Sequence, residues 1–257
     1  MNIVACIKQV VDVSQVKVDE ASQQLILKGI PLKTSDFDKN AVEEAVKIKE
    51  KLGGKLTVMT VGGAQASESI RESLAMGADE GIILTDPGFE NLDAYGISKV
   101  LAGGIKKIGQ VDVILCGEAA IDTYAGQVGP MLAEQLGIPV ITYVTKVTAE
   151  ADKLIAERDV GDKIVTVENS YPVVLTTTKE LNEPRLPNMM QILQAANKKI
   201  ETWGANDLGL TTEQFAARLS TSDIKGFQMD RKNIMIEGEP DEAAGKLIDH
   251  LKEALGR

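Results

Sequence analysis

The stretch DFDKNAVEEAVKIKEKLGGKLTVMTVGG, residues 36–63, joins a helical pattern to a strand pattern and decides the fold class. Its apolar helical positions fall on one face, opposite a face of Glu and Lys: Ala41, Ala45, Ile48 and Leu52. Gly53 follows as a helix stop signal. The apolar run Leu56–Val61 is typical of a strand buried on both faces. The stretch therefore predicts a helix that leads directly into a buried strand.

The same alternation extends along the chain on both sides of this stretch. Short β-branched runs predict strands over Asn2–Lys8, Leu56–Val61, Gly81–Thr85, Val111–Cys116, Pro139–Val144 and Pro172–Thr178. Two further amphipathic segments, AQASESIRESLAMGAD and GISKVLAGGIKKIG, predict helices between strands. Buried strands joined by such helices indicate an α/β fold, a mostly parallel sheet with helices on both faces. Ligands of such sheets bind beyond the carboxyl ends of the strands.

Two regions depart from this pattern. Between residues 149 and 168 the chain alternates with period two around Gly161-Asp162, which predicts a β-hairpin attached to the α/β body. From about Asn197 the chain consists of short segments and a final helix over Asp241–Leu255, too little to enclose a core. We therefore expect an α/β domain over residues 1–196 and a C-terminal arm over residues 197–257 that lies across this domain or a partner chain.

Composition excludes several classes of function. Among 257 residues, 28 Lys and Arg face 38 Asp and Glu, a net charge of -10 that argues against nucleic-acid partners and anionic membranes. No run approaches the roughly 20 apolar residues of a bilayer-spanning helix. The start MNIVACIKQV has no basic region and no cleavage site. We expect a cytoplasmic protein without direct membrane insertion.

The supply of Cys and His also limits the chemistry. Cys6 and Cys116 each lie in an apolar run typical of a buried strand, and His250 is the one histidine. The chain therefore offers few side chains that could form a zinc site, an iron–sulfur cluster or a Cys-His dyad. We expect buried thiols, no metal site and no catalytic side chain.

Three loops at predicted strand ends are the candidate ligand sites. In Val61–Gln65, the glycines Gly62 and Gly63 permit close approach to the backbone, although a tight turn without a ligand fits equally well. The loop contains neither G-x-G-x-x-G nor a P-loop motif. In Cys116–Pro130, the small residues before a helix suit a phosphate held by main-chain amides at the positive end of the helix dipole. A small-residue loop selected for packing is the alternative.

The third loop, Lys33–Asp38, comes directly before the first predicted helix. Asp36 or Asp38 could cap this helix. Phe37 would then project from a loop near the ligand-binding edge of the sheet, although half-buried packing is the default reading.

Taken together, these segments resemble the β subunits of electron-transfer flavoproteins over residues 1 to about 205. The matching pieces, in order, are VACIKQVVD, NAVEEAVKIKEK, SIRESLAMGAD, VILCGEAAIDTYAGQVGP and KELNEPRLPNMM followed by KKI. The resemblance implies a Rossmann-like sheet that binds an adenine nucleotide and a larger α subunit that holds the redox-active FAD. It implies AMP as this subunit's own nucleotide. A second FAD is the alternative, because the Q-V-G-P ending resembles members that bifurcate electrons from NADH.

The resemblance also implies site residues. The nucleotide would be lined by Cys6, Ser35, Val61, Gly62, Ala120, Thr123, Ala125, Gly126, Gln127 and Val128. Phe37 falls where the family places an aromatic ring close to the flavin of the α subunit. This chain departs from the family pattern at Glu118, Ala119 and Thr123, which replace a basic residue, a glutamine and an acidic residue. Ser35 stands in place of the family's asparagine.

The family's partner-recognition loop corresponds to residues 182–190, with Met189 as the anchor and Leu186 as the runner-up. The implied function is carriage of electrons from an acyl-CoA dehydrogenase, as in fatty acid oxidation, to a quinone oxidoreductase. Such a chain is an electron carrier rather than an enzyme unless it bifurcates electrons.

Two other classes of function are weaker. An adenylating or ATP-hydrolysing enzyme would need a phosphate loop after the first strand, where this chain has Lys8-Gln9-Val10-Val11. A free-standing nucleotide-binding protein of the stress-protein type predicts a homodimer and leaves residues 180–257 unexplained.

Overall fold

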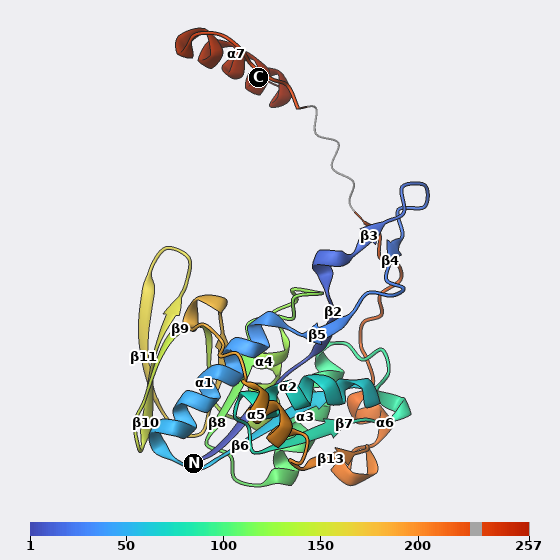
Figure 1. Cartoon of the computed structure of the whole chain (residues 1–257), viewed down its shortest axis with the longest axis vertical. Helices are drawn as coiled ribbons and strands as arrows, with labels where there is room; N and C mark the ends of the chain where they lie inside the picture. The colour runs from blue at the N-terminus through green and yellow to red at the C-terminus, as the bar shows by residue number, and fades with distance from the viewer. Residues whose placement is uncertain (227–232, 257) are drawn as a thin grey trace. The chain divides into compact units, whose positions relative to one another are not determined.

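A computed structural model describes residues 1–226 and 233–256, which fall in two compact units (Figure 1). The first unit comprises Met1–Lys17 and Leu27–Asp223. The second comprises Val18–Ile26 and the described residues from Ile224 onward. The first unit contains the large sheet and every candidate site residue predicted from the sequence.

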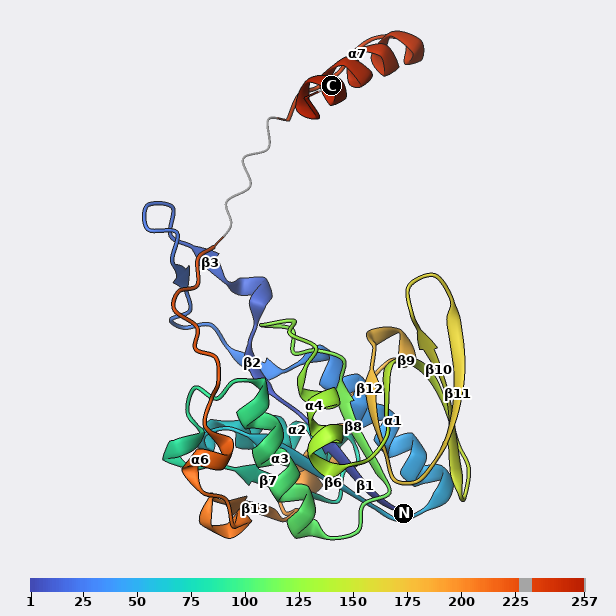
Figure 2. The same cartoon turned by 180° about the vertical axis from the view of Figure 1, so that it is seen from behind.

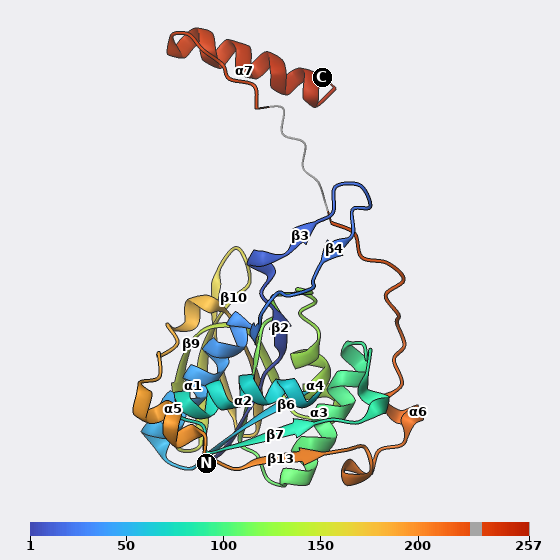
Figure 3. The same ribbon diagram turned by 45° about the vertical axis from the view of Figure 1, so that its right-hand side comes forward.

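A nine-stranded sheet forms the first unit, in the order β11-β10-β9-β12-β8-β1-β6-β7-β13. The strands are β1 (Asn2–Cys6), β6 (Lys55–Val61), β7 (Glu80–Leu84), β8 (Val113–Gly117), β9 (Val140–Ala149), β10 (Lys153–Asp159), β11 (Ile164–Ser170), β12 (Val173–Thr177) and β13 (Ile200–Trp203). All neighbours from β9 to β13 are parallel, and β10 and β11 add an antiparallel hairpin. Figure 3 shows β6, β7 and β13 side by side. The predicted fold class is confirmed.

Helices cover both faces of the sheet. On the face toward the viewer in Figure 1 lie α1 (Asp36–Leu52), α2 (Ser67–Met76) and α5 (Met189–Ala195). On the face seen in Figure 2 lie α3 (Ala94–Ile108), α4 (Val128–Leu136) and the short α6 (Thr212–Phe215). The alternation of strand side chains explains the two layers. In β1, Ile3 and Ala5 pack under α1 and α2, while Val4 and Cys6 pack under α3 and α4.

Small elements complete the first unit. β2 (Gln9–Val11) pairs with β5 (Leu32–Thr34), and short 3-10 turns occur at Val13–Gln15, Ala64–Ala66, Pro87–Phe89, Lys179–Leu181 and Asn206–Leu208. β3 (Lys17–Val18), whose Val18 belongs to the second unit, pairs with β4 (Leu25–Ile26) of that unit. The second unit contains α7 (Pro240–Ala254), which confirms the helix expected over Asp241–Leu255. Within the described ranges, no helix has the length and apolar character that crossing a bilayer requires.

The segment expected to form an arm begins as part of the sheet. β13 pairs with β7 in parallel register, and the first unit extends to Asp223. Phe215 of α6 is buried and meets Phe89 edge to face, with ring centroids 5.1 Å apart. Packing therefore fixes residues 200–215 to the sheet and α3.

Candidate functional site

The candidate site lies where the strand order reverses direction. From β1 the chain continues to β6 and β7 on one side, and later to β8 and β12 on the other. In open α/β sheets, such a switch point leaves a crevice at the carboxyl ends of the two central strands. A cavity of about 640 Å³ occupies this position, with Cys6–Lys8 at the end of β1 and Cys116–Gly117 at the end of β8 among its lining residues.

Most of the residues predicted for the nucleotide line this cavity. They are Cys6, Val61, Ala120, Thr123, Ala125, Gly126, Gln127 and Val128. The last four form the loop into α4, whose first turn supplies backbone N–H groups without partners inside the helix. Gly126 has φ +64°, and an added Cβ there would come no closer than 3.6 Å to its neighbours. The backbone is therefore open to a ligand at this point.

Two of the residues predicted for the nucleotide, Ser35 and Gly62, are not among those that line the cavity. Ser35 is fully buried, and its Oγ accepts the N–H of Ile121 at 3.2 Å. Gly62 donates its N–H to the carbonyl oxygen of Leu84 at 3.0 Å. Ser35 thus supports the loop after β8, and Gly62 ties the end of β6 to β7.

Phe37 does not project from a loop; it packs, more fully than the default half-buried reading expects. Its residue lies in the first turn of α1 and is 6% exposed. The ring packs edge to face against Tyr124, with centroids 5.7 Å apart and an interplanar angle of 67°. The expected aspartate cap is also absent from α1, because Ser35 occupies the N-cap position. Asp36 instead pairs with Lys33 at 2.9 Å, and Asp38 faces the sheet.

Of the charged residues at the cavity, the sequence singled out Glu118 in the candidate loop but did not assign Lys8, Asp38 or Asp93 to the site. Lys8, Asp38, Asp93 and Glu118 all line it, and the Nζ atom of Lys8 pairs with Asp122 at 2.7 Å. Burial raises the pKa of Asp38 to about 7, opposed by N–H bonds from Lys8 and Gly117. Burial also raises the pKa of Glu118, opposed by the hydroxyl of Tyr124. The cavity is thus bordered by carboxylates, and its lysine is already paired.

The wall opposite the α4 loop was also missed. It consists of the start of α3 and Leu219–Thr221. The Asp93 carboxylate joins these parts, since it accepts N–H bonds from Gly96 at 2.9 Å, Arg218 at 2.8 Å and Leu219 at 2.9 Å. The Arg218 guanidinium lies 3.7 Å from the ring centroid of Tyr95. No signal in the polar stretch after Leu219 marks it as a cavity wall.

The two cysteines face each other at the floor of the cavity. Cys6 of β1 is in register with Cys116 of β8, and both are free and buried as expected. A hydrogen bond with Cys6, together with burial, raises the pKa of the Cys116 thiol well above its usual value. Among the described residues, no group of three or more His, Cys, Asp or Glu side chains is placed to hold a metal ion.

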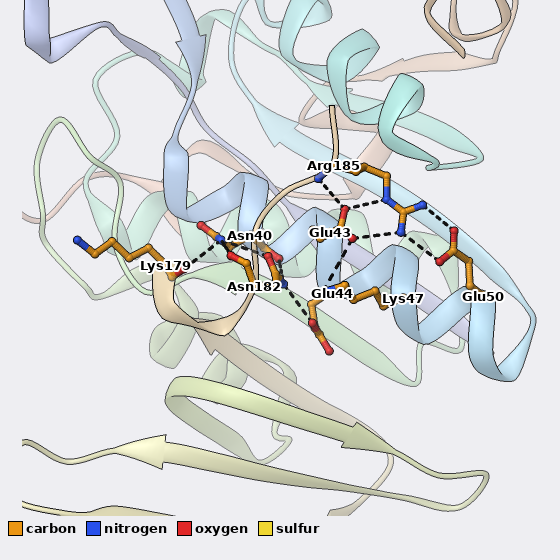
Figure 4. A network of polar contacts seen from close by, with 8 residues as sticks. All are labelled: Asn40, Glu43, Glu44, Lys47, Glu50, Lys179, Asn182 and Arg185. Atoms are coloured by element: carbon orange, nitrogen blue, oxygen red, sulfur yellow. Dashed lines mark hydrogen bonds and ion pairs between the residues drawn. The ribbon is translucent and has the colours of Figure 1, made fainter. Parts of the chain in front are cut away.

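The predicted recognition loop is fixed to α1 at its base and exposed at its tip. Arg185 makes bidentate contacts with Glu43, at 2.8 and 3.1 Å, and with Glu50, at 2.6 and 3.1 Å (Figure 4). Asn182 exchanges hydrogen bonds with Asn40 and donates to Glu44. Leu186 is 94% exposed and Met189, the first residue of α5, is 71% exposed. Neither side chain packs beneath its own loop.

A doubly covered parallel sheet with a cavity at its switch point places the chain among the open α/β proteins, whose ligands bind at this position in the fold. Residues 23–208 match the family model described as the electron transfer flavoprotein domain, and the chain belongs to this family. Three relatives cover 98% of this chain and are themselves covered over 98% of their length. The chain is 42% identical to the electron transfer flavoprotein subunit beta of Thermoanaerobacterium thermosaccharolyticum and 39% identical to that of Clostridium acetobutylicum. It is 40% identical to the caffeyl-CoA reductase-Etf complex subunit CarD of Acetobacterium woodii. The resemblance to the β subunits is confirmed.

Proposed function

We propose that this chain is the β subunit of a heterodimeric electron-transfer flavoprotein that accepts electrons from an acyl-CoA-type dehydrogenase and passes them to a quinone oxidoreductase. The family match and the similarity to β subunits over nearly the whole chain support this proposal. The redox-active FAD, in a larger α subunit, supplies the electron chemistry when it is bound. We retain a cytoplasmic location as part of this proposal.

The observation that carries the proposal is the cavity at the end of β1 and β8. We propose that it holds AMP. Apolar side chains of Val61, Ile97 and Leu101 suit the adenine and ribose, and the N–H groups at the start of α4 suit a phosphate. Lys8 is held by Asp122, so a single phosphate bound by amides fits this wall better than a polyphosphate. The chain's own residues thus bind and orient a nucleotide whose role is structural.

The alternative is a second FAD in this cavity and electron bifurcation with NADH. One feature of the cavity favours it: besides the residues carried over from the family motif, the lining includes the start of α3 and Leu219–Thr221. One relative belongs to a complex named for caffeyl-CoA reductase. Under this alternative the chain would take part in an enzyme reaction.

Counting the bound nucleotides tests these proposals. The full-length chain would be purified with the larger subunit, the complex denatured, and the released FAD and AMP quantified. We expect one FAD and one AMP per heterodimer. Two FAD and no AMP would establish the alternative, and a complex that releases neither nucleotide would contradict the proposed function.

We also propose that the exposed tip of residues 182–190 docks the dehydrogenase, with Met189 as the anchor. Truncating an apolar anchor at the centre of an interface costs about 2 kcal/mol, or roughly 30-fold in affinity. Met189→Ala should therefore raise the dehydrogenase's apparent KM for this protein by about that factor, with flavin content unchanged. Leu186→Ala tests the second candidate. Ile164→Ala, an exposed apolar residue of β11, serves as the control. Equal KM values for the wild type and both loop variants would refute the assignment.

The remaining proposal concerns the C-terminal region, expected over residues 197–257 to form an arm that wraps the α subunit. Residues 200–215 pack on this chain's own sheet, so the proposal rests on α7. In α7 and its C-cap residue, four apolar residues at helical spacing are about half exposed or more: Leu247, Ile248, Leu251 and Leu255. An amphipathic helix gains most of its stability by covering such a face. The α subunit is the partner that the proposed function supplies.

A further inference from the structure

Asp38 occupies an unusual position for an acidic residue. It lies in the first turn of α1, is 6% exposed, and borders the cavity at the ends of the two central strands. Its neighbour in the same turn, Asp36, is half exposed and pairs with Lys33. The two aspartates thus have opposite environments, although either could have capped the helix.

The carboxylate of Asp38 bridges two strands that diverge. One oxygen, Oδ2, accepts the main-chain N–H of Lys8 at 2.8 Å, directly after β1. The other, Oδ1, accepts the main-chain N–H of Gly117 at 3.0 Å, at the end of β8. An added Cβ at Gly117 would lie 2.5 Å from Oδ1, so glycine permits this close approach. One side chain therefore fixes both strand ends that form the floor of the cavity.

Only a carboxylate satisfies both donors fully. Hydrogen bonds to an ionised oxygen are roughly twice as strong as neutral ones. An amide in the same place offers one oxygen acceptor and would direct its NH2 group at the second N–H. The charged groups that face Asp38 are Lys8, which favours the ionised form, and Asp122, which opposes it. The thiols of Cys6 and Cys116 lie on the strands beneath, and Asp38 raises the pKa of Cys116.

We propose that Asp38 is a positioning residue, whose carboxylate holds the main chain of Lys8 and Gly117 at the spacing that shapes the cavity, and whose protonation loosens both strand ends. This inference about the empty chain needs no ligand. Its consequence for nucleotide affinity rests on the proposed function.

The sign of the pH effect follows from linkage. The two N–H bonds act to lower the pKa of Asp38, against a larger effect of burial that brings it to about 7. Release of the N–H groups while the carboxyl stays buried removes the lowering effect, so the released form binds a proton more tightly. Protonation below about pH 7 therefore favours release of the two strand ends. Global stability responds in the opposite direction. The folded pKa lies above the unfolded value, so this group's contribution to stability is present at low pH and is lost as the pH rises through about 7.

Amide hydrogen exchange of the full-length chain tests the inference. Protection factors of the Lys8 and Gly117 amides, corrected for intrinsic exchange, should fall about tenfold between about pH 8 and about pH 6 in the wild type. Asp36→Asn is the matched control and should show the same profile. Asp38→Asn should show low protection that does not vary with pH. If Asp38→Asn retains the wild-type protection and its pH profile, the inference is wrong.

The pH profile of amide protection in the wild type tests the role of Asp38 even if Asp38→Asn does not fold. Protection of the two amides that stays constant or increases toward low pH would overturn release on protonation. Nucleotide binding is measured separately, with AMP as the probe, and Asp38→Asn should raise the Kd about tenfold. A wild-type chain that binds no AMP would count against the proposed function, while the exchange data would still decide the role of Asp38.

Discussion

Replacing Arg185 with alanine is expected to lower the free energy of unfolding by about 3 kcal/mol, because it leaves a buried carboxylate without its main partner. The side chain of Glu43 is 4% exposed, and its other cation, Lys47, is 4.0 Å away. Arg185 also reaches Glu50, whose side chain is 55% exposed. Hydrogen bonds to Glu50 and Glu43 raise the pKa of the guanidinium. Urea unfolding of the full-length chain provides the measurement.

Two further variants separate the contribution of the buried Glu43 from that of the exposed Glu50, and the charge of Arg185 from its geometry. Glu50→Gln removes only the exposed half of the pair and should cost less than about 1 kcal/mol. Arg185→Lys keeps the positive charge but loses the planar guanidinium that contacts both carboxylates. Its free energy of unfolding should lie between those of the wild type and Arg185→Ala. A loss in Arg185→Ala no larger than that in Glu50→Gln would show that Glu43 is stable without its partner.

The Arg185 variant should also affect docking. Arg185 and Asn182 hold the base of the proposed recognition loop to α1, and the loop ends at the exposed Met189. Without Arg185 the loop samples more conformations, so binding the dehydrogenase costs more conformational entropy because the loop must be ordered. The dehydrogenase's apparent KM should rise, while the FAD content of the complex stays unchanged.

Gly129→Ala should both destabilise the chain by about 1–3 kcal/mol and reduce its bound nucleotide. An added Cβ would lie 2.4 Å from Cγ2 of Thr176, and Tyr143 holds Thr176 in place with an N–H bond of 3.1 Å to its Oγ1. The start of α4 must therefore shift away from β12. The N–H groups proposed to hold the phosphate would shift with it. Thermal unfolding and nucleotide content per heterodimer are the two measurements.

Gly245→Ala is the matched control for this substitution. Gly245 lies within α7, and nothing lies within 4 Å of an added Cβ. Alanine is favoured over glycine inside helices by about 1 kcal/mol, so this variant should keep or gain stability. If Gly129→Ala unfolds at the wild-type temperature with full nucleotide content, close packing between α4 and β12 is not required.

Regular elements with strong periodicity could be predicted from the sequence. The apolar face of residues 36–52 became α1, and the alternation around Gly161-Asp162 became the β10–β11 hairpin. Both patterns arise because one face of the element packs on a core, and the sequence shows this as a periodic placement of apolar residues. Most of the loop into α4 lines the cavity, and its role in binding a nucleotide stays a prediction.

The elements that were missed depend on contacts between distant segments. Ile200–Trp203 is a strand because the edge of β7 is available to it, and four residues carry too little pattern to show this. Asp38 fits a helix cap as well as a bridge in sequence terms, and only the meeting of Lys8 and Gly117 distinguishes the two roles. The sequence also left Phe37 in the loop before the first helix, whereas α1 begins at Asp36 and includes Phe37 in its first turn.

The central position of β1 affects how the chain can be synthesised. β1 is synthesised before both of its partner strands, since Ile3 pairs with Leu56 on one side and Val113 on the other. Translation at about 5–20 residues per second leaves both edges of this apolar strand unpaired for several seconds. An apolar strand with two unpaired edges is a template for pairing with neighbouring chains, so the central position of β1 makes the period of synthesis the one most exposed to aggregation.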